Sequence, residues 1–543
     1  MALEIEAVAP AAPETRGLAR TAWPPIFILA PALLVAAAIM LPIAYVVGRT
    51  FGAGVDAWDL LVQRSVLDTL LRTVYLSVAV TAATVAIAVP IAWLTVRTDL
   101  PLKRFWAVLT VLPLVIPSYV GALVAVTALG PKGLVQQMIE GPFGVDRLPG
   151  IYGFSGSLLV LSFLSFPYVL LSVRAALWNL DPAMEEAARS LGRGAWTTFR
   201  RVTLPHLRPA IAAGGLLVAL YTLSDFGAVS LLRFNSFTRV IYLQYETAFD
   251  RTLAAASSLV LVMVAFALLM IEARARGRSR YHRSAVGSAR VPGVIRLKAW
   301  RWPALIFVAS VVLISLVLPV TVLTYWLVRG LEAGESLSFV WEALLNSAYV
   351  SLLAAAVTLA AALPVAFLTV RHAGWFSTLL ERVTYIGFAL PGIVVALAFV
   401  YFGARYVTPL YQTLPLLVIA YVILFLPVAV GTIRSSLLQL NPHLEEAARG
   451  LGRSPVHVFF TVLLPLLRAG LAASAVGVFL VTMKELPATL VLSPLGFKTL
   501  ATTTWSASSA AFFARAAAPA LLLVLISSLP VAFLTFREQR PVS

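Results

Sequence analysis

Two acidic residues, Asp225 and Glu485, lie near the ends of long apolar segments, where an ionised side chain is costly and usually has a function. They occupy matching positions in a sequence repeat whose offset is 260 residues. Carboxylate oxygens are the ligands that hard cations prefer, so this pair is our candidate for a translocation pathway. The alternative is that both are helix-end or loop charges at a membrane interface, with Lys484 neutralising its neighbour.

The rest of the chain offers no catalytic constellation. It contains no cysteine, which excludes thiolate metal sites and cysteine nucleophiles. Its five histidines form no pair at ligand spacing, so no metal site is firmly assigned. None of its five lysines follows a glycine, as the Gly-Lys-Ser/Thr of a phosphate-binding loop requires. We therefore expect a chain that is not an enzyme, binds no cofactor and leaves nucleotide hydrolysis to separate chains.

A charged block occurs twice in this apolar sequence. Glu185–Arg193 returns as Glu445–Arg453, and each copy is followed at the same distance by Leu-Pro. Asp181-Pro182 and Asn441-Pro442 precede the copies and are typical helix starts, with the aspartate or asparagine as N-cap. Each copy should be a short helix that a glycine terminates. A polar helix repeated in a membrane-like sequence indicates two docking surfaces for a partner, although an interfacial helix on lipid headgroups is the alternative.

The expected helix is amphipathic. Residues spaced i, i+4 and i+7 form an apolar face, and glutamate and arginine four residues apart form a charged rim. The apolar faces consist of Met184, Ala188 and Leu191, and of Leu444, Ala448 and Leu451. The rim pairs are Glu185 with Arg189 and Glu445 with Arg449.

At these residues the chain resembles the permease subunits of ATP-binding-cassette importers. Their cytoplasmic signature is Glu-Ala-Ala, three residues, Gly, nine residues, an aliphatic residue, one residue and Leu-Pro. In that family the block is a coupling helix that sits in a groove of an ATPase subunit. The resemblance implies two copies of a cytoplasmic ATPase, which bind ATP and magnesium. The implied ATPase-coupling residues are Glu185, Glu186, Ala187, Ala188, Gly192, Leu204 and Pro205, and Glu445, Glu446, Ala447, Ala448, Gly452, Leu464 and Pro465.

Over essentially its whole length the chain is similar to fused, two-half permeases of the ferric-iron importer type. This implies ferric iron uptake, with cargo delivered by a periplasmic substrate-binding protein. Fused permeases for thiamine and for aminophosphonates look similar, so these or another small solute are alternative cargoes. The residues that carry the similarity are Ser224-Asp225-Phe226-Gly227, Lys484–Leu490, Gly496, Thr499–Thr502 and Trp505.

The composition is that of a membrane protein. Of 543 residues, 60% are hydrophobic and 12% are charged, against about 25% charged in a soluble domain. The net charge of +17 lies in short clusters between apolar runs, which the positive-inside rule explains without nucleic acid. We expect twelve transmembrane segments of about 20 residues. They are roughly 24–47, 69–96, 105–129, 153–177, 206–231, 253–273, 303–328, 346–370, 379–403, 412–435, 467–493 and 513–536.

The repeat is parallel and extends beyond the blocks. Tyr75–Arg97 matches Tyr349–Arg371 with an offset of 274 residues, which falls to 260 by Pro167 and Pro427. The first half therefore has 14 additional residues, which we place in an enlarged outer loop at 130–152. Two halves of the same sidedness imply a pseudo-two-fold axis along the membrane normal.

Sidedness follows from the basic residues. The stretch 274–301 carries nine lysines and arginines and no acid, which is typical of a cytoplasmic linker, the alternative being a nucleic-acid-binding arm. Six spans per half then place both termini in the cytoplasm. We predict a cytoplasmic tail at 1–22, a first permease half at 23–273, the linker at 274–301 and a second half at 302–543.

These observations predict an all-α, polytopic protein of the bacterial inner (plasma) membrane, with about 12 transmembrane helices in two parallel six-helix repeats. The predicted function is that of an importer permease. A secondary transporter that needs no ATPase would have the same hydropathy but would not need two docking blocks. A channel or a structural membrane protein explains neither the blocks nor the basic linker.

Overall fold

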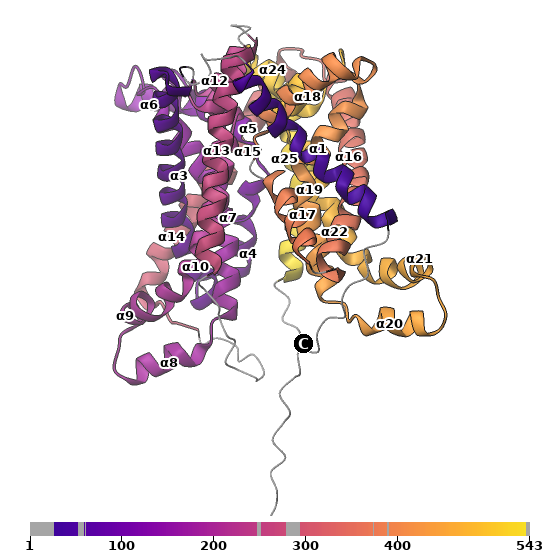
Figure 1. The fold of residues 1–543 in the computed structure, drawn as a ribbon. Helices are drawn as coiled ribbons and strands as arrows, with labels where there is room; N and C mark the ends of the chain where they lie inside the picture. The colour runs from indigo at the N-terminus through magenta and orange to yellow at the C-terminus, as the bar shows by residue number, and fades with distance from the viewer. Residues whose placement is uncertain are drawn as a thin grey trace, which may run out of the picture.

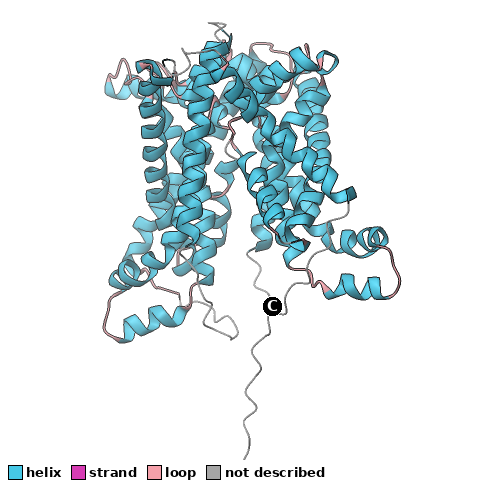
Figure 2. Cartoon of the chain, in the orientation of Figure 1, coloured by secondary structure: helices cyan, strands magenta, loops and turns pink. Residues whose placement is uncertain are grey.

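The structure is a computed structural model that describes residues 26–52, 59, 61–246, 251–277, 294–372, 374–387 and 390–538. Within these residues it is built of helices, with one isolated bridge between Thr98 and Ile295 (Figure 2). The predicted tail 1–22 and most of the linker 274–301 lie outside the described residues. The predicted all-α fold class is confirmed.

Eleven of the described helical segments are long and apolar enough to cross a membrane, which a helix can do because it satisfies its own backbone hydrogen bonds. The first half contains α1 (Ile26–Phe51), α3 (Arg64–Arg97), α4 (Lys103–Leu109), η1 (Leu112–Val115), α5 (Ser118–Leu129), α6 (Leu134–Phe143), α7 (Phe154–Asn179), α8 (Pro182–Ser190), α9 (Ala195–Thr198), η2 (Phe199–Thr203), α10 (Leu204–Ser224), α11 (Gly227–Leu231), α12 (Phe237–Glu246) and α13 (Arg251–Gly277). The second contains η3 (Lys298–Trp300), α14 (Arg301–Val312), η4 (Leu313–Val317), α15 (Leu318–Glu332), α16 (Ser338–Arg371), α17 (Trp375–Ile386), α18 (Gly392–Tyr406), η6 (Thr408–Leu410), α19 (Leu414–Leu438), α20 (His443–Gly450), α21 (Pro455–Val458), η7 (Phe459–Leu463), α22 (Leu464–Met483), α23 (Pro487–Leu492), α24 (Leu500–Ser509) and α25 (Phe513–Glu538).

The third predicted span of each half is discontinuous. The segment 105–129 divides into α4, η1 and α5, and 379–403 divides into α17 and α18. Pro117 and Pro391 stand immediately before α5 and α18, with extended ψ angles of 147° and 142°. Proline lacks an N–H and disfavours helix in the residue before it, so the chain turns at these points. The break recurs at the same place because the two prolines are equivalent in the repeat.

The predicted outer loop at 130–152 contains a helix, α6, so the prediction of a loop there is wrong. Its glycines mark the helix ends: Gly133 is the N-cap, and Gly144 is the C-cap with a φ of +62°. Gln136 is buried and donates hydrogen bonds from Nε2 to Val145 O at 2.8 Å and to Glu140 Oε2 at 3.1 Å. The additional residues of the first half thus form a folded element.

The first span of each half packs against the other half. Helix α1 contacts α16, α17 and α18, whereas α14 and α15 contact α3, α4 and α5. One buried apolar cluster unites α3, α5, α7, α10 and α11 with α14, α15, α24 and α25, and the other unites α16–α19, α22 and α23 with α1, α12 and α13. The two sequence halves therefore contribute to two shared cores, which we call the two bodies.

The two bodies meet at one end and lie apart at the other (Figure 1). Helices α12, α18 and α24 lie where the bodies meet, which we call the far end. Helices α8 and α20 lie at the opposite end, the α8/α20 end, one below each body. The repeated blocks thus form two well-separated projections on the same end of the molecule.

Candidate functional site

The repeated blocks form two short helices, α8 and α20, which we call the docking helices (Figure 1). Asp181 Oδ1 accepts a hydrogen bond from Ala183 N at 2.9 Å, and Asn441 Oδ1 accepts one from His443 N at 3.0 Å. The helix starts therefore lie where the sequence predicts them, although α20 begins one residue later than α8 relative to its proline.

The two glutamates of each docking helix face in opposite directions. Glu185 and Glu445 are buried against the bundle, whereas Glu186 and Glu446 are exposed. The prediction that Glu185 and Glu445 belong to an exposed rim is therefore wrong. Of these four glutamates, Glu186 and Glu446 are therefore the two accessible at the surface.

An arginine at the end of a long helix explains the buried glutamates. Arg371 Nε lies 2.7 Å from Glu445 Oε1, while the predicted rim partner, Arg449, is 4.0 Å from Glu445 Oε2. In the first half Arg97 Nη2 is 4.0 Å from Glu185 Oε1. A buried carboxylate is unfavourable without a charged or hydrogen-bonding partner. Sequence reasoning missed both arginines as functional residues, although each closes the matching segment of the repeat.

The residues of the predicted apolar face of the docking helices differ in their exposure. Ala188 is buried, whereas Leu191 is 80% and Leu451 is 83% exposed. Each leucine lies next to the glycine that ends its helix. An exposed leucine at the tip of each of two equivalent helices can bury apolar surface in a protein groove, and full burial of a leucine side chain contributes about 1.5–3 kcal/mol.

The glycines that end the docking helices adopt a left-handed conformation. Gly192 has a φ of +78° and Gly452 a φ of +77°, and a Cβ at either position would meet no atom within 4 Å. A side chain would thus be disfavoured by the backbone conformation alone, by roughly 1–2 kcal/mol. We expect the Gly192→Val/Gly452→Val variant to fold but to bind the ATPase about 5- to 30-fold less tightly per site. Co-purification at graded ATPase concentrations measures this change.

Gly194 provides the matched control, because it has no left-handed φ and also has open space around its Cβ position. The Gly194→Val variant should retain wild-type affinity for the ATPase. Equal affinity in the Gly192→Val/Gly452→Val variant and the wild type would show that the left-handed turns have no role in docking.

Asp225 and Glu485 lie at equivalent helix breaks. Asp225 separates α10 from α11, and Glu485 lies between α22 and α23. Each carboxylate caps the short helix that follows. The hydrogen bonds run from Ala228 N and Val229 N to Asp225 Oδ2 at 3.1 and 3.3 Å, from Ala488 N to Glu485 Oε1 at 3.1 Å, and from Thr489 N to Glu485 Oε2 at 3.2 Å.

The two carboxylates also meet the starts of the discontinuous spans. Ser118, the first residue of α5, hydrogen-bonds Asp225. Gly392, the first residue of α18, packs so closely on Glu485 that a Cβ there would lie 2.6 Å from Oε1. The shorter side chain, that of Asp225, thus lies opposite a serine, and the longer one, that of Glu485, lies opposite a glycine. Ser118 and Tyr119 also pack on Gly227, the first residue of α11, where a Cβ would lie 3.0 Å from Ser118 Oγ and 2.8 Å from Tyr119 Cβ.

Lys484 does not neutralise Glu485. Its Nζ donates a hydrogen bond to Leu114 O, in the first half, at 3.1 Å. The structure thus places each acid at its own helix break with backbone partners. Whether they also face a cation pathway stays a prediction.

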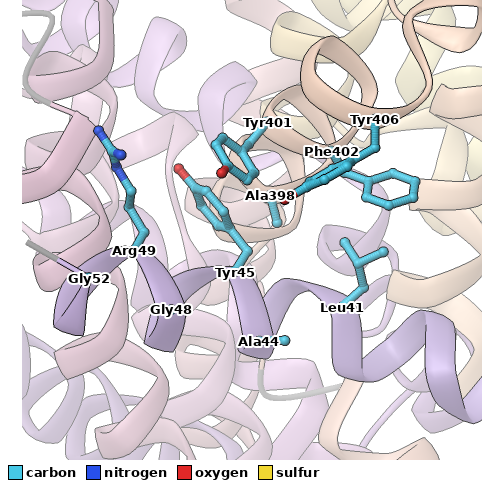
Figure 3. A pocket seen from close by; sticks show the side chains of 10 residues that line it. All are labelled: Leu41, Ala44, Tyr45, Gly48, Arg49, Gly52, Ala398, Tyr401, Phe402 and Tyr406. Carbon is cyan, nitrogen blue, oxygen red and sulfur yellow. The ribbon is translucent and has the colours of Figure 1, made fainter.

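A pocket of about 430 Å³ opens at the far end between α1 and α18 (Figure 3). Tyr45, Tyr401, Tyr406 and Arg49 supply its polar groups, and the rings of Tyr45 and Tyr401 are 4.9 Å apart between centroids. None of the described residues that line it has a carboxylate side chain. The pocket is therefore better suited to aromatic or anionic groups than to a bare cation, and it does not include Asp225 or Glu485.

Known proteins are similar to this chain in sequence. The Fe(3+)-transport system permease protein FbpB 2 of Haemophilus influenzae is 34% identical over 516 residues, which are 94% of this chain and 98% of that protein. The ferric transport system permease protein FbpB of Actinobacillus pleuropneumoniae is 25% identical over 411 residues, 71% of this chain and 58% of that protein. The molybdenum transport system permease protein ModB of Escherichia coli (strain K12) is 32% identical over 161 residues, 29% of this chain and 69% of that protein.

The sequence profile of one family matches twice, over residues 85–278 and 349–541. Each match spans one docking helix and one of the carboxylate-bearing helix breaks. Because the two matches together cover more than half of the sequence, the chain belongs to the family described as binding-protein-dependent transport system inner membrane component.

Proposed function

We propose that this chain is the permease of a binding-protein-dependent, ATP-driven importer of ferric iron. The observation that carries the proposal is the 34% identity to a ferric permease over 94% of the chain, because the similarity includes both halves and both docking helices. The two carboxylates at the helix breaks agree with a hard, oxygen-preferring cargo.

The proposed partners are two copies of an ATPase, one on each docking helix, and a substrate-binding protein at the far end. The presence of two equivalent helices, each with an exposed glutamate and an exposed leucine, supports two ATPase copies per chain. ATP and magnesium would bind to the ATPase subunits, and this chain would act as the conduit.

We place the α8/α20 end in the cytoplasm, together with both termini and the linker 274–301, and α6 on the periplasmic side. Introduced cysteines test this placement cleanly, because the chain has no native cysteine. In intact spheroplasts an impermeant thiol reagent should label Gln137→Cys, at an exposed position of α6, and should not label Ser288→Cys until the membrane is permeabilised. The reverse labelling pattern would invert the proposed orientation.

The cargo is tested by the substrate-binding protein that delivers it. We expect the cognate binding protein, purified from cells without added metal, to contain ferric iron and to stimulate ATP hydrolysis by the assembled transporter. A binding protein that carries thiamine, an aminophosphonate or another small solute would replace ferric iron as the cargo and leave the importer assignment in place.

A further inference from the structure

Each docking helix is fastened to the end of a long helix by an arginine. Arg97 is the last residue of α3, and Arg371 is the last residue of α16. Both arginines contact the buried glutamate of a docking helix and the backbone carbonyl just before that helix. The contacts are Arg97 Nη2 to Glu185 Oε1 at 4.0 Å and to Leu180 O at 3.4 Å, and Arg371 Nε to Glu445 Oε1 at 2.7 Å and Nη2 to Leu440 O at 3.4 Å.

The two arginine contacts differ in one detail. In the first half Thr203 Oγ1 donates a hydrogen bond to Glu185 Oε1 at 2.7 Å, and Arg97 is completely buried. The equivalent residue of the second half is Leu463, which has no hydroxyl, and there the arginine bonds the glutamate directly. The contact between Arg371 and Glu445 is therefore simpler to perturb by mutation than the contact between Arg97 and Glu185.

In the contact with Glu445 the positive charge belongs to Arg371 and not to the histidine that follows it. His372, its neighbour in sequence, is close enough to Arg449 and Glu445 for both charges to act on it. Burial, followed by the nearby Arg449, lowers the pKa of His372 below its usual range. This histidine is therefore neutral at neutral pH and does not substitute for the arginine.

The same two long helices hold a second element at the far end. Thr73 Oγ1, on α3, accepts a hydrogen bond from Phe237 N at 3.1 Å, and Ser347 Oγ, on α16, accepts one from Leu500 N at 2.7 Å. Phe237 and Leu500 are the first residues of α12 and α24. The two hydroxyl side chains and the two residues whose backbone N–H they accept are all buried.

The spacing between the two ends is identical in the two halves. Thr73 and Arg97 are 24 residues apart, as are Ser347 and Arg371. At a rise of 1.5 Å per residue each pair spans roughly 36 Å, the thickness of a membrane. Helix α3 packs along α7 and α10, and α16 packs along α19 and α22, and each long helix continues unbroken through an internal proline, Pro90 or Pro364.

We propose that α3 and α16 are rods that transmit movement of the docking helices to α12 and α24, and that Arg97, Arg371, Thr73 and Ser347 are the positioning residues at their ends. This inference rests on the proposed function, because it requires ATPases on the docking helices. Closing of the ATPases moves α8 and α20, the arginines move the rods, and the hydroxyl contacts move the far-end helices that follow the carboxylate-bearing breaks.

The test uses the complete transporter, with its ATPases, in proteoliposomes. In the Arg371→Gln variant we expect normal ATPase assembly, normal basal ATP hydrolysis and about a tenfold loss of the stimulation by loaded binding protein, with uptake reduced in parallel. Ser347→Ala, at the other end of the same rod, should reproduce this uncoupling. The reversed pair Arg371→Glu/Glu445→Arg should recover most of the stimulation that either single reversal loses.

Arg434→Gln is the matched control. Arg434 Nε lies 3.4 Å from Glu381 Oε1, between α19 and α17, and that ion pair touches neither docking helix. Loss of this ion pair should leave the stimulation of ATP hydrolysis by loaded binding protein unchanged. Wild-type stimulation of ATP hydrolysis in both Arg371→Gln and Ser347→Ala would overturn the proposal that α16 transmits movement. Loss of ATPase assembly in Arg371→Gln would also overturn it, since that arginine would then only shape the docking surface. Absence of ATP-driven uptake by the wild-type chain would instead refute the proposed function.

Discussion

Replacing Leu191 and Leu451 together by aspartate is expected to abolish assembly with the ATPase subunits. Both leucines are at least 80% exposed at the tips of the docking helices, so the substitution leaves the permease core untouched. A central apolar contact of an interface commonly contributes about 2 kcal/mol or more, and a buried aspartate without a partner adds a desolvation penalty. Each site should therefore lose about 30-fold or more in affinity, and the double variant should not co-purify with the ATPase.

Leu495 provides the control for this double variant. It is 87% exposed but follows α23, in the loop before α24 at the far end. Leu495→Asp should assemble with the ATPase as the wild type does. Normal co-purification of the Leu191→Asp/Leu451→Asp variant would mean that α8 and α20 are interfacial helices on lipid and not docking helices for a protein.

The second large effect is expected on transport. In the Asp225→Asn/Glu485→Gln variant the amide oxygen at position 225 can still accept both backbone hydrogen bonds that cap α11, and the amide oxygen at position 485 can accept one of the two that cap α23, while both negative charges are removed. A carboxylate about 4 Å from a cation contributes roughly 1–4 kcal/mol between aqueous and protein-like dielectric conditions. Ferric uptake should therefore fall by about fivefold or more per site, with ATPase assembly unchanged.

Glu140→Gln removes a carboxylate charge from α6 and should leave uptake unchanged, since this side chain is exposed and hydrogen-bonded within its own segment. Uptake equal to wild type in the Asp225→Asn/Glu485→Gln variant would show that the two acids only cap helices. The Ala double variant, which loses the cap acceptors as well, would then be impaired while the amide variant is not.

The sequence predicts most of the membrane-spanning helices because each needs only its own apolar run. It fails at the two discontinuous spans, since Pro117 and Pro391 lie inside runs that are apolar on both sides, and prolines within spans are commonly tolerated. It also fails at α6, where glycines at the helix ends were interpreted as loop residues. The exchange of α1 and α14–α15 between the bodies depends on contacts between distant segments, which a hydropathy pattern does not contain.

For the site, the sequence locates both docking helices and both helix-break acids, because the repeat marks them. It does not distinguish Glu185 from Glu186. Helical periodicity assigns both to a polar surface, and only the position of Arg97 decides which one is buried. The repeat did contain a signal, since Arg97 and Arg371 are equivalent and both end a long helix in the segment that matches.

Uptake of radiolabelled ferric iron into proteoliposomes that contain the chain and its ATPase subunits tests the central claim most directly. With loaded binding protein on the far-end side and ATP on the α8/α20 side, iron should accumulate. Omission of ATP, of the ATPase or of the binding protein should each stop it. Accumulation that continues without the ATPase, driven by an ion gradient, would contradict the account and identify a secondary transporter.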